Sequence, residues 1–398
     1  MVKILIGVIG KPNVGKSTFF SAITQHIVEI ANYPFTTINP NIGTAYVRKT
    51  CPHTILGKNC NPKNSVCMEG IRMIPVSIMD VAGLVPEAHK GKGLGNRFLD
   101  NLRNADALIH VVDISGSTDK EGNNVGKNSN DPFEDVEFVE REIAFWMADI
   151  LSRNWKKVAR RVGTDGTKLE TLLSQQLSGL GIDENQIEKA LENASFGPVE
   201  EWGENDFLSV AAEILKISKP FVIAANKADI ADKENIEKLK GRVKYPVIPV
   251  SADYELALVR ATKAGLIKYR PGDTSFKIID ETKLNENQKK ALEKIRIFME
   301  KNGGTGVQKV LESAVFDQLH MISVYPVEDE NHWIDKSGNI LPDVYLMPAG
   351  STALDLAFKV HSDLGENFIR AIDGKKKIIV GKDYLLKDGD VIKIVAKA

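Results

Sequence analysis

The sequence lacks several features that mark particular classes of protein. Only three cysteines occur among its 398 residues, which does not indicate a disulfide-stabilised scaffold. Basic and acidic side chains number 52 and 53, so no net charge attracts nucleic acid, and any such contact must come from a local patch. No apolar run approaches the roughly 18 residues that a membrane span needs. We therefore expect a cytoplasmic protein that does not bind membranes.

The N-terminal segment and the length of the chain bear on protein targeting and on the number of domains. The apolar N-terminal segment is short and runs directly into Lys11-Pro12, which does not predict a signal peptide. A length of 398 residues predicts two or three domains. The hydrophobic share of 43% is ordinary for a globular protein, so a sizeable core is expected.

A complete phosphate-binding loop of the form Gly-x-x-x-x-Gly-Lys-Ser follows the first apolar segment. It lies between a buried-strand pattern at Val2–Ile9 and a helix-compatible segment at Thr18–Thr24. Its backbone N–H groups would surround a β-phosphate at a helix N-terminus, where the helix dipole favours negative charge. We expect Lys16 to contact the β- and γ-phosphates and Ser17 to bind Mg²⁺. The predicted nucleotide-binding residues of this loop are Gly10, Lys11, Pro12, Asn13, Val14, Gly15, Lys16, Ser17 and Thr18.

Two later segments indicate that the base is guanine. The segment Asn226-Lys227-Ala228-Asp229 follows a buried-strand pattern, and Asp229 would accept hydrogen bonds from guanine N1–H and the 2-amino group. Adenine offers no such pair of donors. The stem of Lys227 would lie against the base, and Asn226 would tie the loop together. After one further strand pattern come Ser251 and Ala252, and the Ala252 N–H suits guanine O6.

Two other segments would sense the γ-phosphate. A strand pattern ends at Asp80, which would hold Mg²⁺ through water, and the N–H of Gly83 would contact the γ-phosphate. The segment Phe35-Thr36-Thr37 offers a hydroxyl that would complete the Mg²⁺ shell, with Thr37 as the predicted ligand and Thr36 as the neighbouring alternative. Such loops order when the γ-phosphate is present and relax on its loss, as in a switch. The predicted metal ligands are Ser17, Thr37 and Asp80.

These motifs together resemble those of the translation-factor class of GTPases. Its five signatures are matched by Gly10–Ser17, Phe35-Thr36-Thr37, Asp80–Gly83, Asn226–Asp229 and Ser251-Ala252. The segments Tyr33–Thr37 and Asp80–Leu84 are similar to the Obg superfamily, and Ala88–Leu99 with Asp106–Asp113 is similar to its YchF branch. Many YchF relatives have a degraded guanine motif, from which the resemblance implies ATP use. Because Asp229 and Lys227 are intact, as in an archaeal-like member, GTP is the predicted nucleotide and ATP is the alternative.

The expected rate of hydrolysis is low. Ras-like enzymes orient the attacking water with a glutamine, and Leu84 occupies that position here, as the resemblance to Obg proteins implies. Because leucine cannot polarise water, we expect intrinsic hydrolysis on the order of 10⁻³ per second or below. Asn13 resembles the residue that helps to hold K⁺ in related GTPases, where the ion would replace an arginine finger. The predicted catalytic residues are Lys16, Thr37, Gly83 and Asn13.

An insertion separates the strand pattern at Ala107–Ile114 from the guanine motif, and it resembles the helical hairpin of YchF proteins. Residues 119–131 are polar and rich in glycine and asparagine, which predicts a mobile loop. A long helical pattern then starts at Pro132 and continues beyond Trp155. One face of this helix carries a group of cations, which could contact phosphates or could be an ordinary solvated surface. The five cations that the helical spacing places on it are Arg153, Lys156, Lys157, Arg160 and Arg161.

The C-terminal part predicts two helices followed by a small mixed sheet. Helical patterns at Lys283–Lys301 and Val307–Leu319 are joined by the glycine-rich segment Gly303–Gly306. Pro348–Thr352 and the closing segment Lys387–Ile392 resemble a TGS domain, which implies binding to RNA or to a ribosome-associated partner. The expected organisation is a G domain at 1–118 and 205–280, an inserted helical domain at 119–204, a helical connector at 281–319 and a TGS domain at 320–398.

All three cysteines are grouped with one histidine in the sequence. Cys51, His53, Cys60 and Cys67 fall within seventeen residues, shortly after Thr37. Three thiolates and an imidazole are an adequate tetrahedral set for Zn²⁺, and such a site would be structural because it leaves no open position. The spacing lacks the Cys-x-x-Cys knuckle of common zinc modules. A zinc site, a disulfide and free thiols are therefore the alternatives.

The predicted fold is an α/β P-loop GTPase with a doubly wound sheet, an inserted helical hairpin and a C-terminal ubiquitin-like α+β TGS domain. The predicted function is a GTP-binding, slowly GTP-hydrolysing switch that is monomeric and associated with the ribosome or RNA, without DNA sequence recognition. Mg²⁺ is the expected cofactor, and K⁺ and structural Zn²⁺ are further candidates. The alternatives are a YchF-like ATPase that regulates stress or metabolism, and a nucleotide-dependent protein scaffold.

Overall fold

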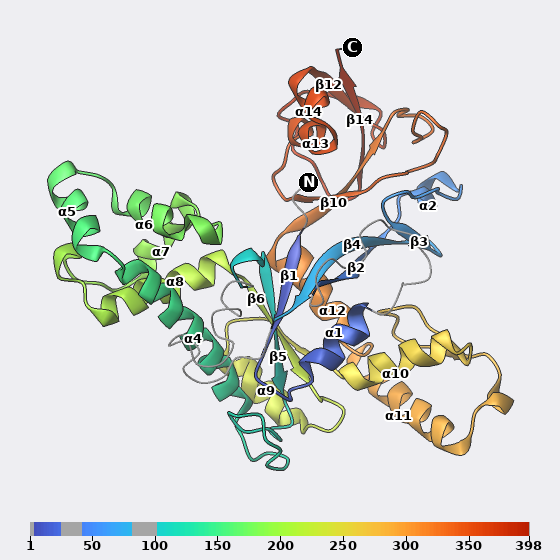
Figure 1. The fold of residues 1–398 in the computed structure, drawn as a ribbon. Helices are drawn as coiled ribbons and strands as arrows, with labels where there is room; N and C mark the ends of the chain where they lie inside the picture. Colours follow the sequence, from blue (N-terminus) through green and yellow to red (C-terminus); the bar gives the residue numbers. More distant parts are fainter. Residues whose placement is uncertain (1–3, 25–41, 82–101, 398) are drawn as a thin grey trace. The chain divides into compact units, whose positions relative to one another are not determined.

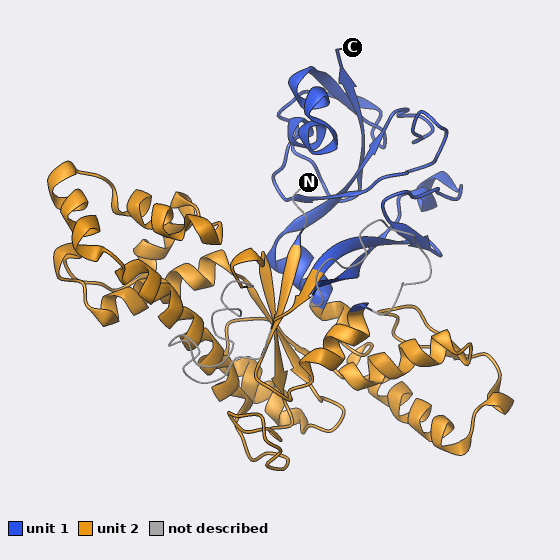
Figure 2. Ribbon diagram, viewed as in Figure 1, with its two compact units in different colours: residues 1–4, 24–77, 311–398 blue, residues 5–23, 78–310 orange. Residues whose placement is uncertain are grey.

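The computed structural model describes residues 4–24, 42–81 and 102–397 of the chain (Figure 1). The chain forms two compact units (Figure 2). Unit 1 comprises 1–4, 24–77 and 311–398, and unit 2 comprises 5–23 and 78–310. This division runs across the domain ranges expected from the sequence, because it groups part of the expected G domain with the expected TGS domain.

Unit 2 is built on a parallel sheet whose strands are continuous apolar runs. Its strand order is β4-β1-β5-β6-β7, and the pairs from β1 to β7 are parallel. Every residue of β5 is buried, as expected of a parallel strand that helices cover on both faces. β4 is shared by both units, and just after its end the Val81 N–H donates to Val8 O at 3.0 Å. The strands are β1 Leu5–Ile9, β4 Ile71–Asp80, β5 Ala107–Asp113, β6 Phe221–Asn226 and β7 Val247–Pro249.

Helices lie along this sheet and complete the doubly wound α/β arrangement that was predicted (Figure 1). Those that follow strands β1, β6 and β7 are α1 Lys16–Thr24, α9 Lys233–Arg242 and α10 Ala252–Lys263. Val112 of β5, Ile223 of β6 and Ile236 of α9 are buried in one core cluster between these layers. Within the described ranges, no helix combines the length and the apolar character needed to cross a membrane.

The insertion between β5 and β6 consists of five α-helices. They are α4 Pro132–Ser152, α5 Trp155–Asp165, α6 Leu169–Leu177, α7 Glu184–Asn193 and α8 Glu204–Ser218. The side chain of Asp131 starts α4 by accepting a hydrogen bond from the Phe133 N–H at 3.0 Å. α4 packs against α8, which returns the chain to the sheet.

The continuous helix expected from Pro132 is wrong, because the chain breaks the helix between α4 and α5. Arg153 has extended backbone with ψ 126°, and Asn154 is left-handed with φ 57°. Trp155 then starts α5 with its ring stacked on Trp202, at 4.5 Å between ring centroids. This aromatic contact fixes the start of α5 in a way that helical periodicity does not reveal.

The break also changes the predicted cationic face. Arg153 lies at the end of α4, where its guanidinium pairs with Asp149 at 2.6 Å. The remaining cations lie on α5, and we call them the α5 cations. They are Lys156, Lys157, Arg160 and Arg161.

The rest of unit 2 is a short hairpin, one helix and the start of a second helix that crosses the unit boundary. The elements are β8 Ile267–Lys268, β9 Lys277–Ile278, α11 Glu286–Asn302 and α12 Val307–Glu312. Leu258 of α10, Ile267 and Ile295 are buried in one cluster that holds the hairpin and α11 against α10. α12 continues into a π-helical segment at Ser313–Gln318.

Unit 1 contains a second sheet with two helices on it, which agrees with the predicted ubiquitin-like α+β domain. The strand order is β11-β10-β14-β12-β13, and β10 and β14 are parallel. Val324, Leu356 and Ile392 are buried together between the sheet and the first helix. The elements are β10 Met321–Val327, β11 Tyr345–Pro348, α13 Ala353–Val360, α14 Ser362–Glu366, β12 Phe368–Asp373, β13 Ile378–Val380 and β14 Asp390–Ala396.

The N-terminal part of unit 1 is an antiparallel extension that includes the cysteines. Its elements are β2 Ile42–Thr50, α2 His53–Leu56, β3 Val66–Met68 and the first part of β4. β3 and β4 pair as a hairpin in which Cys67 lies opposite Arg72. Two ion pairs join β2 to the C-terminal residues of the same unit: Arg48 with Glu312 and Lys49 with Asp388, each at 2.7 Å.

Candidate nucleotide-binding site

The phosphate loop connects β1 to α1 at the carboxyl edge of the parallel sheet. α1 begins at Lys16, so the loop leads directly into a helix N-terminus, as the sequence predicted. Gly15 has φ 91°, a conformation that favours glycine. A Cβ atom at this position would also collide with the side-chain nitrogen of Asn226, so the loop and the guanine segment require a glycine between them.

Two predicted ligands of phosphate and magnesium face each other in this site. The Lys16 ammonium lies 3.4 Å from Asp80 Oδ1, without the geometry of a hydrogen bond. Asp80 ends β4, next to the strand that leads into the phosphate loop. Ser17 is exposed in the first turn of α1. A phosphate held by Lys16 and a cation held by Asp80 would therefore lie close together, which is the arrangement that a Mg²⁺–nucleotide complex needs.

Asn226 links three parts of the site through one side chain. Its amide nitrogen donates to Val14 O of the phosphate loop at 2.9 Å, and its Oδ1 accepts from the Ala252 N–H at 3.0 Å. Both bonds are buried, so they fix the relative positions of the loops. The Ala252 N–H, which was predicted to serve guanine O6, is thus used within the protein. A guanine contact there would have to share or replace the bond to Asn226.

The other residues of the guanine segment lie in the same turn. The Ala228 N–H donates to Val250 O at 3.0 Å, which holds Asp229 beside the segment that contains Ser251. Asp229 is half-buried. Burial raises the pKa of Tyr254, and the charge of Asp229 raises it further, so the carboxylate and this tyrosine are near each other. The Ser251 hydroxyl caps α10 by accepting from the Tyr254 N–H at 3.3 Å.

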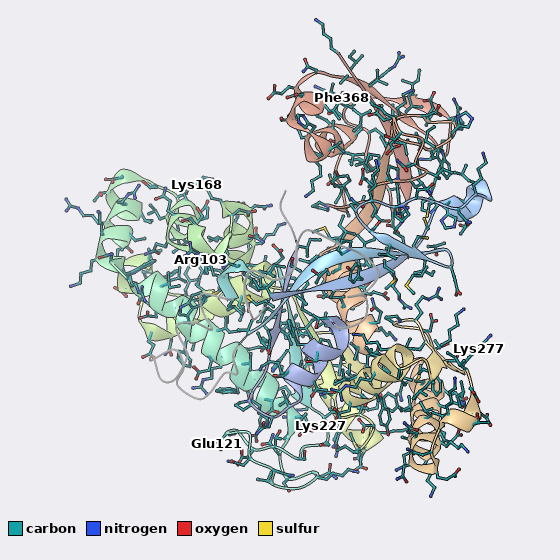
Figure 3. All side chains as sticks on the ribbon, turned by 45° about the vertical axis from the view of Figure 1, so that its right-hand side comes forward. Arg103, Glu121, Lys168, Lys227, Lys277 and Phe368 are labelled. Atoms are coloured by element: carbon teal, nitrogen blue, oxygen red, sulfur yellow. The ribbon has the colours of Figure 1, made fainter. Side chains whose placement is uncertain are left out.

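A buried carboxylate that the sequence did not single out organises the other side of this turn. Asp113 ends β5 and accepts hydrogen bonds from Ser115, Ser117, Thr118 and Lys227. Burial by itself would raise the pKa of Asp113, but the bonds from Lys227 and two serines hold it below its ordinary value. The segment Ser115-Gly116-Ser117-Thr118 follows soon after the buried strand β5, and this polar segment is the sequence signal that could have identified the network. Lys227 is labelled in Figure 3.

The segment predicted to be a mobile loop forms a network of hydrogen bonds beside the phosphate loop (Figure 3, where Glu121 is labelled). Lys11 is 2% exposed, and its ammonium binds Asp135 and the Thr118 carbonyl, both at 2.7 Å. The Lys11 ammonium is therefore not available to phosphate, and only its backbone can serve the predicted binding role. Asn13 donates from Nδ2 to Gly122 O at 2.9 Å.

Several predicted site residues lie outside the described residues. They are Phe35, Thr36, Thr37, Gly83 and Leu84. Within the described part of the chain, the predicted Mg²⁺ ligands are Ser17 and Asp80. The structure also brings together the three cysteines and His53, in unit 1.

Comparison with protein families identifies three segments. Residues 5–140 match the model of the 50S ribosome-binding GTPase, and residues 224–329 match the Obg-like GTPase YGR210-like, G4 motif-containing domain. Residues 337–396 match the TGS domain. The first two matches include the phosphate loop and the guanine segment, respectively.

Comparison with individual proteins covers almost the whole chain. A GTP-binding protein of Methanocaldococcus jannaschii is 56% identical over 396 residues, which is 99% of each chain. The ribosome-binding ATPase YchF of Bacillus subtilis is 28% identical, over 97% of each chain. The crystal structure of a GTP-binding protein from Pyrococcus horikoshii superposes with a TM-score of 0.77 at 42% identity, over 99% of this chain and 100% of that one.

Proposed function

Because the chain belongs to the YchF branch of the Obg-like GTP-binding proteins, we propose that it is a slow GTP-hydrolysing switch that acts on the ribosome or its RNA. The observation that carries the nucleotide assignment is the Asn226 bridge between the phosphate loop and the Ser251-Ala252 turn. This bridge links the guanine segment, which includes Asp229, to the phosphate loop, so a base bound at Asp229 would lie at a defined position relative to that loop. A carboxylate at that position accepts from two guanine donors that adenine lacks.

ATP is the alternative nucleotide, since the relative from Bacillus subtilis is named as an ATPase. In place of the guanine N1–H and 2-amino group, adenine has the acceptor N1 and a C2–H. Asp229 would therefore face an acceptor and have no donor to bind, because the 6-amino group of adenine lies where guanine has O6. An unpaired buried acceptor costs about 1–3 kcal/mol, and a charged one costs more. This cost supports GTP as the preferred substrate.

The residues that would act on the γ-phosphate fit a Mg²⁺-dependent transfer to water. When bound, Mg²⁺ would neutralise charge that develops on the phosphate oxygens. Ser17 and Asp80 would hold the ion, and Lys16 would turn from Asp80 to the phosphates. Thr37 and Gly83 are the proposed switch contacts. Leu84 supplies no group that could orient water, and this supports slow intrinsic hydrolysis.

K⁺ is a further proposed cofactor at Asn13. The Nδ2 atom of Asn13 is used in the bond to Gly122 O, so the side chain has a fixed orientation. Its Oδ1 atom is then the one that a cation would bind. Stimulation of hydrolysis by K⁺ over Na⁺, and its loss in Asn13→Ala, would support this role.

The α5 cations are the proposed contact with RNA. Lys156, Lys157 and Arg160 are exposed, and no ion pair involves any of the α5 cations within the described residues. Arg153, in contrast, is already paired with Asp149. Exposed, unpaired cations on one short helix can each release counterions on meeting a phosphate, which favours binding at low salt.

Co-sedimentation with purified ribosomal subunits tests the proposal. The full chain is incubated with a non-hydrolysable GTP analogue, with GDP or without nucleotide, over a series of salt concentrations. We expect binding that is strongest with the analogue and that weakens as salt rises. Binding that is independent of nucleotide would contradict the switch, and absence of binding in every state would redirect the search to soluble protein partners.

A further inference from the structure

The cysteines and one histidine form a cluster at the antiparallel end of unit 1, far along the chain from the guanine segment. We call the four residues Cys51, His53, Cys60 and Cys67 the Cys/His cluster. Cys51 follows β2, His53 starts α2, Cys60 is in the connection after α2, and Cys67 lies in β3. Their ligand atoms all lie within 4.8 Å of one another.

Two of the distances match the edges of a tetrahedral zinc site. With Zn–S bonds of about 2.3 Å and a Zn–N bond of about 2.05 Å, a tetrahedron has S···S edges of about 3.8 Å and S···N edges of about 3.6 Å. The Sγ atoms of Cys51 and Cys60 are 3.8 Å apart, and Cys67 Sγ is 3.6 Å from His53 Nδ1. From this geometry we propose that the Cys/His cluster binds a structural Zn²⁺ ion, with Nδ1 as the histidine ligand.

The charge of a neighbouring residue supports the same conclusion. Arg72 is fully buried and lies opposite Cys67 in the β3–β4 hairpin. Its guanidinium donates to Ser65 Oγ at 2.9 Å and to Leu341 O at 2.8 Å, its Nε is unpartnered, and no carboxylate among the described residues pairs with it. A buried cation without a hydrogen-bonded carboxylate is costly, and the half-buried Asp343 interacts with Arg72 only through its charge. Zn²⁺ with three thiolates and a neutral imidazole carries a charge of −1, which would balance Arg72.

The donor set favours zinc and indicates a structural role for the ion. Thiolate and imidazole ligands in tetrahedral geometry select zinc over magnesium or calcium, which prefer oxygen ligands. Four protein ligands leave no open position, so the ion would stabilise structure rather than activate water. No disulfide joins the cysteines in this structure, since the Sγ atoms of Cys51 and Cys60 are 3.8 Å apart and an S–S bond is about 2.05 Å.

The zinc would fix a loop that binds the C-terminal part of the same unit. Just after Cys60, the Asn61 N–H donates to Ile340 O at 2.8 Å and the Lys63 N–H donates to Pro342 O at 2.7 Å. Asn64 exchanges two hydrogen bonds with the backbone of Val344, at 2.9 and 3.0 Å. The segment between Cys51 and Cys67 has few buried apolar side chains, so a metal is the element that would hold it in this binding conformation.

Metal analysis of the full chain tests the proposal. The protein is purified without a metal-affinity step, and zinc is measured by mass spectrometry. We expect close to one equivalent of zinc per chain, and its loss in Cys60→Ser and His53→Ala. His332→Ala, which changes an exposed histidine of the same unit, is the matched control and should keep the metal.

Cobalt substitution keeps the test valid if a variant fails to fold. The wild-type protein is stripped with a chelator and titrated with Co²⁺, and we expect thiolate-to-cobalt charge-transfer bands and tetrahedral ligand-field bands that saturate at one equivalent. Three freely reactive thiols in metal-replete native protein, or a chain mass lower by two hydrogens from a disulfide, would overturn the proposal. GTP binding is measured in parallel and should survive Cys60→Ser, so failure of the zinc site is distinguishable from failure of the nucleotide assignment.

Discussion

Lys227 Nζ lies 2.8 Å from Asp113 Oδ2, and this ion pair joins the guanine segment to the end of β5. The carboxylate is fully buried, whereas the lysine is 23% exposed. In the proposed nucleotide site, this pair would hold the lysine stem along the base. Asp113 therefore positions Lys227 without being a predicted ligand of the nucleotide.

The first prediction concerns this pair. Asp113→Asn removes the charge that holds Lys227, and it should weaken GTP affinity by about tenfold, or about 1.4 kcal/mol. Because the variant leaves a partly buried lysine without its partner, it should also destabilise the fold by about 3–5 kcal/mol. Fluorescent-nucleotide titration and thermal unfolding would measure the two effects separately. Glu234→Gln, at a 75% exposed carboxylate on α9, is the control and should change neither.

The second prediction tests the choice of base. Asp229→Asn replaces an acceptor pair with an amide that suits xanthine, so affinity for GTP should fall and affinity for xanthosine triphosphate should rise. Loss of one charged hydrogen-bond pair should cost about 1.5–3 kcal/mol in GTP binding, which is roughly ten- to a hundredfold. Competition titration against both nucleotides is the measurement. Unchanged GTP affinity would remove Asp229 from the guanine site.

The third prediction is a pH effect from a histidine beneath the phosphate loop. His110 is fully buried in β5, and neither ring nitrogen has a hydrogen-bond partner among the described residues. Burial, and then the charge of Lys11, lower the pKa of His110 from 6.5 to about 3. Between these values the unfolded chain binds a proton that the folded chain does not. The free energy of unfolding should therefore fall as pH is lowered through this window, by up to about 1.4 kcal/mol per pH unit.

A matched pair of variants isolates this contribution. His110→Phe removes the titrating group while keeping an apolar ring, so its stability relative to wild type should increase as the pH falls from 6 toward 4. Urea unfolding at several pH values gives the difference directly, because the other titrations cancel in the comparison. His320→Phe, at an exposed histidine that has no ion pair among the described residues, is the matched control. If the difference in the free energy of unfolding between His110→Phe and wild type does not change with pH, burial does not lower the pKa of His110.

The fourth prediction concerns the α5 cations. Changing Lys156, Lys157, Arg160 and Arg161 to glutamine should weaken ribosome binding and flatten its salt dependence. Each lost phosphate contact should reduce the slope of log K against log salt by about 0.7–0.9. Co-sedimentation at four or more salt concentrations measures the slope. Arg153→Gln is the control, because this residue is already paired with Asp149, and it should leave the slope nearly unchanged.

The local structure of the candidate nucleotide site was largely predictable because its motifs are local. The phosphate loop is a continuous run between a strand and a helix, and the guanine segment follows a buried strand, so neighbouring residues identify them. The side chain of Lys11 was not predictable, because its partner Asp135 is 124 residues away in the sequence. Only the folded chain shows that this lysine is occupied.

Tertiary contacts also explain the other differences from expectation. The α4–α5 break depends on Trp155 meeting Trp202, which sequence periodicity does not encode. Grouping of the cysteines was visible in the sequence, but their distances were not, because the loop after Cys60 takes its shape from backbone partners at Ile340 and Pro342. β2 belongs to unit 1, and its long-range partners there are Glu312 and Asp388, which pair with Arg48 and Lys49.

The composition of unit 1 has a consequence for the order of events during synthesis. Its first large segment, Thr24–Ser77, leaves the ribosome early, whereas its complement, Leu311–Ala398, is translated last, after all of Ile78–Val310. At about 5–20 residues per second, the early segment waits on the order of tens of seconds for the residues that complete its fold. During that interval Arg72 lacks its acceptor at Leu341. The nascent β2–β4 region must then be stabilised by contacts within residues that have already been translated.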